Sequence, residues 1–567
     1  MSHDYHLAPL ANPIHREGPV VLLILDGYGI GKNEAKENPI VAANPVVINE
    51  LVHQAKEHHL YTRLKAHGPA VGLPSESDMG NSEVGHNAFG CGQIYSQGTK
   101  LVDESFASGV IFRTPQWHQV VAETAAHNGT LHMFGLLSDG NIHSHMNQIF
   151  KLLDGAVESG IHKIRMHVLL DGRDVSPTSG LVYINQLEEK LAKLREHNVD
   201  ARIATGGGRM YVTMDRYGSD WKMVQRGWEL MVHGVVMPED VTSEYSGYFR
   251  SATEAIELGR RLWPAKQDQY NPPFVVVDEA GQPIGRMQDG DAVINWNFRG
   301  DRAVQITQTF TAPDAEFTHF ARGAMPRLTY AGLLEYDTEV HIPRLFLVPP
   351  PEIHHTMGQY LCASGVTSYA VAETHKYGHV TFFWNGNKSG CIDEHLEQYD
   401  CVESLPNAQT ESHPEMKAPE VTDKLVEAIR SGRFRFVRCN LANPDMVGHT
   451  GNFQSCVRAV QCMNQCVERV AREVEARGGI LIITADHGNV EIKDNKGSKT
   501  SHTCAPVDFA VRDFAYHGEY TLLPEGQPTA DADGLGAGLS NVAATVMNML
   551  GFEAPAVYRK SLYVPAH

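Results

Sequence analysis

The 567-residue sequence lacks long hydrophobic runs, closely paired cysteines and an excess of basic charge. Its formal net charge of −19 argues against nucleic acid or an anionic membrane as a partner of the surface as a whole. The 9 cysteines form no C-x-x-C pair, and an odd number suits a reducing compartment. The apolar run at 20–25 is far too short to span a bilayer, and the N-terminus shows no signal-peptide core. We therefore expect a cytoplasmic protein.

Length and composition indicate a globular protein with more than one domain. Hydrophobic residues make up 42% of the chain and charged residues 20%, which is ordinary for soluble proteins. A chain of this length can bury more than one core. Histidine is abundant, with 30 residues, so a metal site is worth seeking.

Several strand patterns are followed by polar side chains. The continuously apolar run at 20–25 is typical of a strand covered on both faces of a parallel sheet. Three such runs lead to the carboxylates Asp26, Asp445 and Asp486. Open α/β sheets place their sites at the carboxyl ends of the strands, so we expect these three groups to lie together. The glycines after Asp26 have the wrong spacing for a dinucleotide-binding loop. A fourth apolar run, at 380–384, also reads as a strand.

A second series of strand and helix patterns fills the middle of the chain. Strand patterns at 131–137, 164–170, 202–204 and 292–298 each lead into a polar loop, and most of these loops carry arginines. Leucine and isoleucine recur at helical spacing between 181 and 194. Three consecutive prolines from 349 mark a linker. We therefore predict a discontinuous domain of 1–96 and 349–567, and an inserted domain of 97–348, with hinges near Gln97 and Val348.

The segment 80–86 has neither helical nor strand periodicity, and Ser82 stands in its middle between glycines. A helix starting there would offer unpaired backbone N–H groups to an anion such as phosphate. The alternative is structural, because a serine that opens a helix is commonly its N-cap.

Histidines cluster with two of the three carboxylates. Asp445 and His449 are four residues apart, Asp486 and His487 are adjacent, and His502 follows. Mixed carboxylate and imidazole ligands suit Mn²⁺, Zn²⁺ or Fe²⁺, and the set is too large for one catalytic ion with an open position. Two ions could activate Ser82 as a nucleophile and clamp phosphoryl oxygens. Any one of these residues taken alone reads better as a turn or surface residue.

These motifs, in this order over nearly the whole chain, resemble the cofactor-independent phosphoglycerate mutases of the alkaline phosphatase superfamily. The resemblance implies an α/β fold class with two domains: an alkaline-phosphatase-like α/β/α sandwich, split in sequence by an inserted α/β phosphotransferase domain. It implies two divalent ions, with Mn²⁺ first among Co²⁺, Mg²⁺ and Zn²⁺, and no 2,3-bisphosphoglycerate. One ion would be held by Asp445, His449 and His502, and the other by Asp26, Ser82, Asp486 and His487.

The resemblance also implies contacts to a small acidic substrate, 3-phosphoglycerate or 2-phosphoglycerate, in a monomeric protein. These contacts would come from His143, Arg173, Asp174, Arg209, Arg216, Arg299, Arg302 and Lys376. Arginine forks pair bidentately with carboxylate and phosphate, so several arginines on loops fit such a substrate. For a lone arginine, a solvated surface charge is the simpler interpretation.

The expected mechanism has two transfers. Ser82 attacks the phosphorus of 3-phosphoglycerate, which gives phosphoserine and glycerate, and the metals and Lys376 stabilise the charge. The arginines hold glycerate until its 2-hydroxyl attacks the phosphoserine. Asp174 is the candidate acid/base, with His143 as helper.

Two rival functions remain open at this stage. One is a related metal-dependent phosphatase or phosphopentomutase, although the latter has a threonine nucleophile where this chain has Ser82. The other is a non-enzymatic metal or phosphoglycerate sensor. Release of free phosphate discriminates among them, because a phosphatase liberates it, a mutase liberates little and a sensor none.

Overall fold

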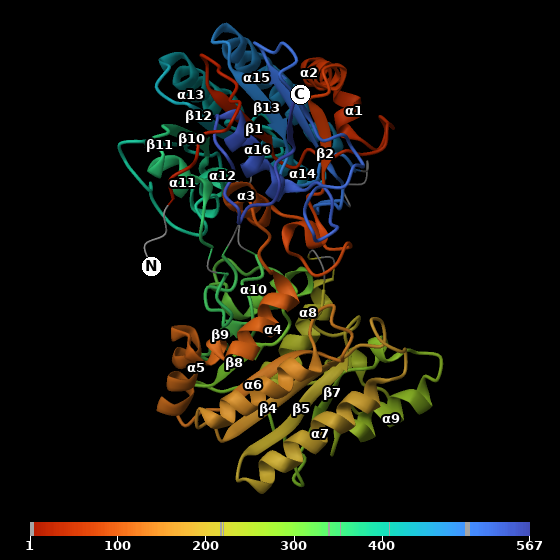
Figure 1. Cartoon of the computed structure of the whole chain (residues 1–567). Coiled ribbons are helices and arrows are strands. Elements are labelled where there is room, and N and C mark those ends of the chain that lie inside the picture. Colours follow the sequence, from red (N-terminus) through yellow and green to blue (C-terminus); the bar gives the residue numbers. More distant parts are fainter. Residues whose placement is uncertain are drawn as a thin grey trace. The chain divides into compact units, whose positions relative to one another are not determined.

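The computed structural model describes residues 5–215, 218, 220–337, 341–351, 353–406, 409–493 and 499–566. Arg216, predicted to contact substrate, lies outside the described residues. The chain divides into two compact units: unit 1 combines Met1–Gln97 with Pro351–His567, and unit 2 is Gly98–Pro350. Each unit contains a seven-stranded sheet (Figure 1). Among the described residues, no helix is long and apolar enough to cross a membrane.

The sheet of unit 1 has the strand order β11-β10-β12-β1-β13-β14-β2. The strands are β1 (Val20–Leu25), β2 (Tyr61–Leu64), β10 (Ser368–Glu373), β11 (Glu397–Val402), β12 (Phe436–Leu441), β13 (Ile480–Thr484) and β14 (Val507–Asp513). The first five strands in that order run parallel, whereas β14 pairs antiparallel with both of its neighbours. All six residues of β1 are buried, as expected for a central parallel strand.

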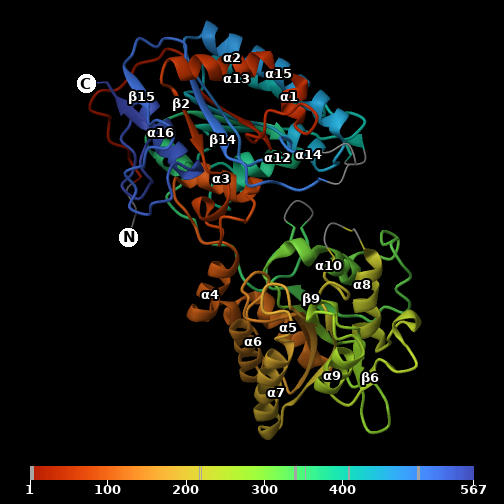
Figure 2. The same cartoon turned by 90° about the vertical axis from the view of Figure 1, so that its right-hand side faces the viewer.

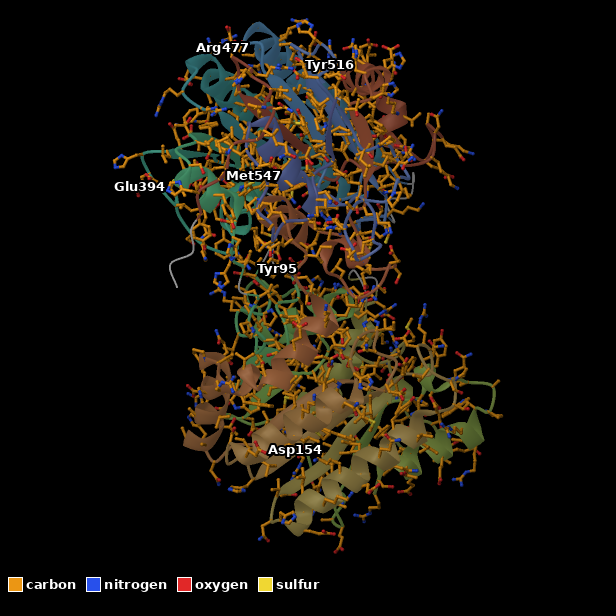
Figure 3. The ribbon with its side chains drawn as sticks, in the orientation of Figure 1. Tyr95, Asp154, Glu394, Arg477, Tyr516 and Met547 are labelled. Atoms are coloured by element: carbon orange, nitrogen blue, oxygen red, sulfur yellow. The ribbon has the colours of Figure 1, made fainter. Side chains whose placement is uncertain are left out.

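Helices cover both faces of this sheet. On one face lie α1 (Pro39–Ala43), α2 (Val46–Glu57), α13 (Ala418–Ser431) and α15 (Phe453–Ala476); α3 (Ser82–Cys91) and α16 (Val542–Met549) lie on the other (Figures 1 and 2). Shorter elements are α11 (Met357–Ala363), α12 (Thr374–Gly378), α14 (Asn443–Gly448), β15 (Tyr520–Leu522) and β16 (Tyr563–Pro565). One large cluster of buried apolar residues joins the sheet to these helices, and it includes Met547 of α16, labelled in Figure 3.

The sheet of unit 2 has the order β6-β7-β5-β4-β3-β8-β9. Its strands are β3 (Leu131–Leu137), β4 (Lys163–Leu170), β5 (Asp200–Gly208), β6 (Tyr248–Phe249), β7 (Phe274–Val276), β8 (Ala292–Asn295) and β9 (Thr329–Gly332). The strands from β5 to β9 in that order are parallel. The carboxyl ends of β3, β4, β5 and β8 therefore lie at one edge of the sheet.

Side chains of unit 2 enter cores on both faces of the sheet because successive strand residues face opposite sides. Met133 joins a cluster with α6 (Met146–Glu158), α7 (Gly180–Glu196) and α9 (Ala252–Leu262). Phe134, the next residue, joins a cluster with α8 (Trp221–Trp228) and α10 (Val304–Thr311). The remaining helices of this unit are α4 (Gly98–Ser108) and α5 (Pro115–Ala126).

The predicted α/β fold class with two α/β parts, one split in sequence by the other, is confirmed. Two local predictions are wrong. The apolar run at 380–384 falls in a π-helical turn, η7 (His379–Phe383), and the strand of this region is β10, upstream of Lys376. The segment 205–208, read as a loop after a short strand, belongs to β5. Its glycines permit this, because a Cβ on Gly208 would lie 2.4 Å from the backbone of Gln269.

Candidate active site

The carboxyl ends of parallel strands bring the predicted ligands of unit 1 together. Asp26 follows β1, Asp445 lies in α14 just after β12, and Asp486 follows β13. Lys376 lies in α12, directly after β10. All four side chains are fully buried although all are chargeable. Buried charges are stable only when they are paired or bind a cation, so this edge of the sheet is a candidate site.

Ser82 is the first residue of α3, and Asn81 is the N-cap that accepts a hydrogen bond from the backbone of Val84. The capping interpretation of Ser82 is therefore wrong, and its hydroxyl is available for another role. Lys376 Nζ donates to Ser82 Oγ over 2.8 Å, and Ser82 Oγ lies 3.0 Å from His487 Nε2. The hydroxyl is thus held between an ammonium group and an imidazole in a buried environment.

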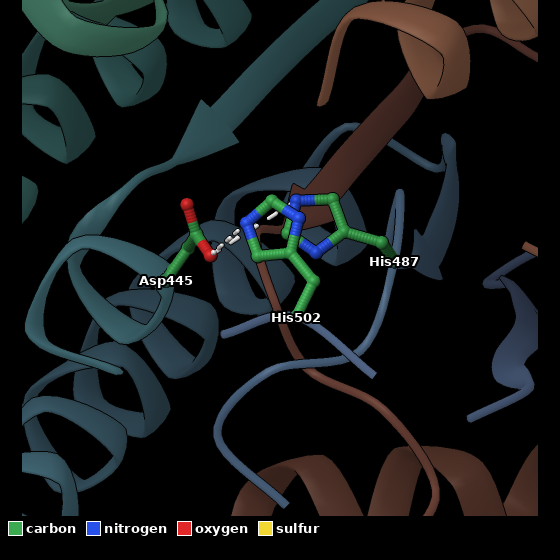
Figure 4. A group of neighbouring side chains, drawn as sticks. All are labelled: Asp445, His487 and His502. Atoms are coloured by element: carbon green, nitrogen blue, oxygen red, sulfur yellow. Dashed lines mark ion pairs between the residues drawn. The ribbon is translucent and has the colours of Figure 1, made fainter. Parts of the chain in front are cut away.

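Three histidines present the same ring nitrogen to this cluster. The Nδ1 atoms of His449, His487 and His502 donate to backbone carbonyls, at 2.8, 3.2 and 2.8 Å. Because a carbonyl oxygen only accepts, each Nδ1 carries the hydrogen and each Nε2 is left as an acceptor or metal ligand. Figure 4 shows the rings of His487 and His502 beside the carboxylate of Asp445.

The donor geometry fits bound cations. His449 Nε2 and His502 Nε2 lie 3.1 Å apart, and both are lone-pair donors that would repel each other without a positive charge between them. Asp445 Oδ1 is 3.4 and 3.3 Å from these two atoms. Among the residues that the structure describes, two groups have ligand atoms within 4.8 Å of one another: Asp445, His487 and His502, and Asp26, Asp486 and His487. His487 belongs to both groups, so two ions held there would be neighbours.

The pKa shifts of the buried groups also fit a bound cation. Burial, followed by repulsion from Asp486, raises the pKa of Asp26 well above its ordinary value. Burial opposes ionisation of Asp445 too, but Lys376 and the facing imidazoles hold the pKa of that carboxyl well below its usual range. Burial lowers the pKa of His487 to about 4, which keeps it neutral and able to bind a cation. A divalent ion would favour the ionised form of Asp26.

In unit 2, the predicted substrate residues follow strands β3, β4, β5 and β8. Arg209 is buried and donates from Nη1 to Asp171 Oδ1 over 2.8 Å and to Asp174. The side chain of Arg173 is exposed.

The remaining predicted contacts of unit 2 lie after β3 and β8. Arg299 Nε is 3.2 Å and His143 Nδ1 is 3.5 Å from Asp301 Oδ1. Arg302 Nη1 donates to the carbonyl of Met214 over 2.9 Å. The described arginines and His143 therefore lie on loops at one edge of the sheet.

The chain matches known proteins over nearly its whole length. The family model described as the BPG-independent PGAM N-terminus matches residues 102–338. The 2,3-bisphosphoglycerate-independent phosphoglycerate mutase of Zea mays is 45% identical over 557 residues, covering 96% of this chain and 95% of the relative. A probable enzyme of the same name from Leptospira interrogans is 44% identical over 564 residues, covering 96% and 97%. This chain belongs to the 2,3-bisphosphoglycerate-independent phosphoglycerate mutase family.

A solved structure extends the match to three dimensions. The phosphoglycerate mutase of Leishmania mexicana, determined at low cobalt concentration, has a TM-score of 0.60 to this chain at 40% identity. The match covers 99% of this chain and 100% of that one. The match in sequence and the match in structure therefore indicate the same family.

The structure adds residues to this mutase site that the sequence did not single out. Asn440 Nδ2 donates to Asp26 Oδ2 over 2.6 Å, and His86 Nδ1 donates to the carbonyl of Ser82 over 2.7 Å. Asp171 accepts hydrogen bonds from Arg209, from Ser138 Oγ at 2.6 Å and from the backbone N–H groups of residues 173 and 174. A polar side chain near the carboxyl end of the strand pattern, close to Asp445, was the available signal for Asn440.

Proposed function

We propose that this chain interconverts 3-phosphoglycerate and 2-phosphoglycerate, the step of glycolysis and gluconeogenesis that its relatives' name describes, without 2,3-bisphosphoglycerate. The observation that carries the proposal is the Ser82 hydroxyl, 2.8 Å from the Lys376 ammonium and 3.0 Å from His487 Nε2, within ligand sets for two cations. In this proposal, unit 1 is the phosphatase-like core and unit 2 binds the acidic substrate.

Asp445, His449 and His502 would hold one divalent ion, and Asp26, Ser82, Asp486 and His487 the other. When bound, the ions supply positive charge that lowers the pKa of the Ser82 hydroxyl and neutralises phosphoryl oxygens. Manganese is our first candidate, with cobalt, magnesium and zinc as alternatives, because each of these ions suits at least part of this set of carboxylates and imidazoles.

Ser82, already ionised, attacks through Oγ the phosphorus of 3-phosphoglycerate in line, so that the Oγ–P bond forms as the bond from phosphorus to the 3-oxygen breaks. The ammonium group of Lys376 stabilises the negative charge on the transferring phosphoryl group, since it already contacts Ser82 Oγ. Glycerate takes a proton on its 3-oxygen. The 2-hydroxyl then loses its proton and attacks the phosphoserine, which restores Ser82.

Residues of unit 2 hold glycerate between the two transfers. Arg173, Arg209, Arg216, Arg299 and Arg302 supply guanidinium groups for the carboxylate and phosphate of the substrate. Asp174 is our candidate for moving the hydroxyl protons, with His143 as helper or orienting group. Asp174 already contacts the buried guanidinium of Arg209, which places its carboxylate on the arginine-bearing loop.

The test is conversion of 3-phosphoglycerate to 2-phosphoglycerate with no bisphosphoglycerate added, after chelation and again after Mn²⁺ is restored. Metal-dependent isomerisation with little release of free phosphate supports the proposal. Phosphate release without isomerisation would instead make the chain a phosphatase. Binding of phosphoglycerate without turnover would make it a sensor.

We also propose that the protein is a cytoplasmic monomer. Sedimentation of the purified chain tests the oligomeric state, and fractionation of cells tests the location. A stable dimer would contradict the first proposal, and recovery outside the cytoplasmic fraction would contradict the second.

A further inference from the structure

Three buried polar residues follow the ligand pair Asp486 and His487 at alternate positions of the chain. Asn489, Glu491 and Lys493 are at most 1% exposed. Neither the expected ligand sets nor the proposed mechanism uses them. A buried ammonium group is costly unless it meets strong acceptors, so Lys493 requires an explanation in terms of its contacts.

The hydrogen bonds in this segment have a fixed direction. Lys493 Nζ donates to Asn489 Oδ1 over 2.5 Å, and an ammonium group can only donate. The amide oxygen of Asn489 therefore faces Lys493, and its NH₂ group must face the other way. That group donates to Asp445 Oδ1 over 2.6 Å and to the carbonyl of Asp445 over 3.2 Å.

The backbone of the same segment is held separately. The backbone N–H of Asn489 donates to Glu491 Oε2 over 2.8 Å, and the hydroxyl of Thr503, next to His502, donates to Glu491 Oε1. The backbone N–H of Lys493 donates to the carbonyl of Glu37 over 2.9 Å. None of these hydrogen bonds uses the side chain of residue 493. The contact of the Lys493 ammonium with Asn489 therefore acts on the amide side chain of Asn489 and not on the backbone of the loop.

Each carboxylate oxygen of Asp445 thus accepts a hydrogen bond. Lys376 Nζ is 2.8 Å from Oδ2, and the amide of Asn489 is 2.6 Å from Oδ1. These two contacts fix the rotation of the carboxylate and turn Oδ1 toward His502 Nε2, 3.3 Å away. Groups that orient a ligand in this way commonly change metal affinity by about 10–100-fold when they are removed.

The geometry points to Lys493 as a positioning residue that acts through Asn489 to orient Asp445 for cation binding. This inference rests on the proposed two-metal function. The ammonium group polarises the amide and locks its orientation, so that Asn489 always presents a donor to Asp445. Without Lys493 the Asn489 amide can rotate by about 180°. Its oxygen would then face the Asp445 carboxylate, and the two negative groups would repel each other.

The test is titration of the chelated full-length protein with Mn²⁺, followed by calorimetry, for the wild type and for Lys493→Met. We expect one of the two Mn²⁺ ions to bind about tenfold or more weakly in the variant, while the other keeps its affinity. Lys388→Met, at an exposed lysine of unit 1, is the matched control and should bind both ions normally.

Asn489→Leu removes the amide and keeps the lysine, so it tests the inference even if Lys493→Met fails to fold. The double variant should bind no more weakly than Asn489→Leu alone, because both changes break one chain of contacts. Two ions bound with wild-type affinity in either single variant would overturn the inference. A wild type that binds no Mn²⁺ would instead overturn the proposed function, so the two failures are distinct.

Discussion

The hydroxyl of Ser82 accepts a hydrogen bond from Lys376 and faces the neutral Nε2 of His487. This arrangement suits a nucleophile, because an ammonium group stabilises the developing oxyanion and the cation that His487 would help to hold lowers the pKa of the hydroxyl. We expect Ser82→Ala to lower turnover by about 10³-fold or more, since loss of a nucleophile removes the covalent route. Turnover assays and mass spectrometry of the quenched enzyme, which should show phosphoserine only in the wild type, check this.

A control for this change is Ser412→Ala, at an exposed serine of the same unit, which should keep wild-type turnover. Normal turnover of Ser82→Ala would exclude the phosphoserine route. Because Ser82 is itself a proposed ligand, the variant should bind one Mn²⁺ more weakly; retained binding of the ion assigned to Asp445, His449 and His502 would show that the alanine did not disturb those ligands.

Asp171 organises the arginine-bearing loop of unit 2 at the residue scale. Its carboxylate is buried and accepts from Arg209, from Ser138 and from two backbone N–H groups of the loop. Asp171→Asn keeps the size but removes the charge facing a buried guanidinium, a loss of about 1–3 kcal/mol. We expect KM for 3-phosphoglycerate to rise about tenfold, with Mn²⁺ binding unchanged.

Steady-state kinetics and Mn²⁺ titration check this prediction. The matched control is Asp154→Asn, an exposed carboxylate on α6 of the same unit, labelled in Figure 3. Its ion pair with Lys190 lies at the surface, where such pairs contribute little. An unchanged KM in Asp171→Asn would show that the loop does not depend on this carboxylate.

At the scale of elements, a buried hydrogen-bond chain crosses β3, β4 and β5. His132 Nε2 donates to Asp291 Oδ2 over 3.1 Å, so His132 Nδ1 is left to accept from His167 Nε2 at 2.9 Å. His167 Nδ1 then accepts from the hydroxyl of Thr205 at 2.8 Å. All donors and acceptors are satisfied when both imidazoles are neutral.

Burial lowers the pKa of His132 and, more strongly, of His167; the nearby Arg165 adds to both shifts, whereas Asp291 opposes the shift at His132. Below the ordinary histidine pKa of 6.5 the unfolded chain therefore binds more protons than the folded one. Stability should fall as the pH drops below that value. Each histidine contributes at most about 1.4 kcal/mol per pH unit.

We expect His167→Gln to flatten the loss of thermal stability between about pH 6.5 and 5, because the unfolded state loses one proton-binding group. Calorimetry across this range checks the prediction. His162→Gln, at an exposed histidine just before β4, should keep the wild-type slope. An equally steep slope in His167→Gln would show that this histidine titrates alike in both states.

Elements were predictable where a local pattern was strong. The apolar run at 131–137 became β3, and the helical spacing from 181 to 194 became α7. The strand prediction for 380–384 was wrong. Aromatic and β-branched residues favour strands, whereas this segment forms a π-helical turn after α12. A local pattern gives no sign of such a turn.

At the scale of the whole molecule, the candidate ligands were predictable because strand order places the ends of parallel strands at one edge. The supporting residues were not, because their partners are distant in sequence. Asn489 contacts Asp445, which lies 44 positions earlier. Arg209 contacts Asp171 at a separation of 38 positions. Only the fold brings such pairs together, so the sequence predicted the candidate ligands at the strand ends but not the residues that contact them.

The two units should also differ in their response to metal. Among the described residues, their hydrophobic clusters share no member, so we expect separate unfolding transitions in calorimetry. All candidate ligands belong to unit 1, and each ion present at 100 times its Kd would stabilise that unit by about 2.7 kcal/mol. Mn²⁺ should therefore raise one transition by several degrees, and chelation should reverse this. Asp171→Asn marks the transition of unit 2 by lowering it. Our assignment of the metal site would be wrong if Mn²⁺ raised the transition that Asp171→Asn lowers and left the other unchanged.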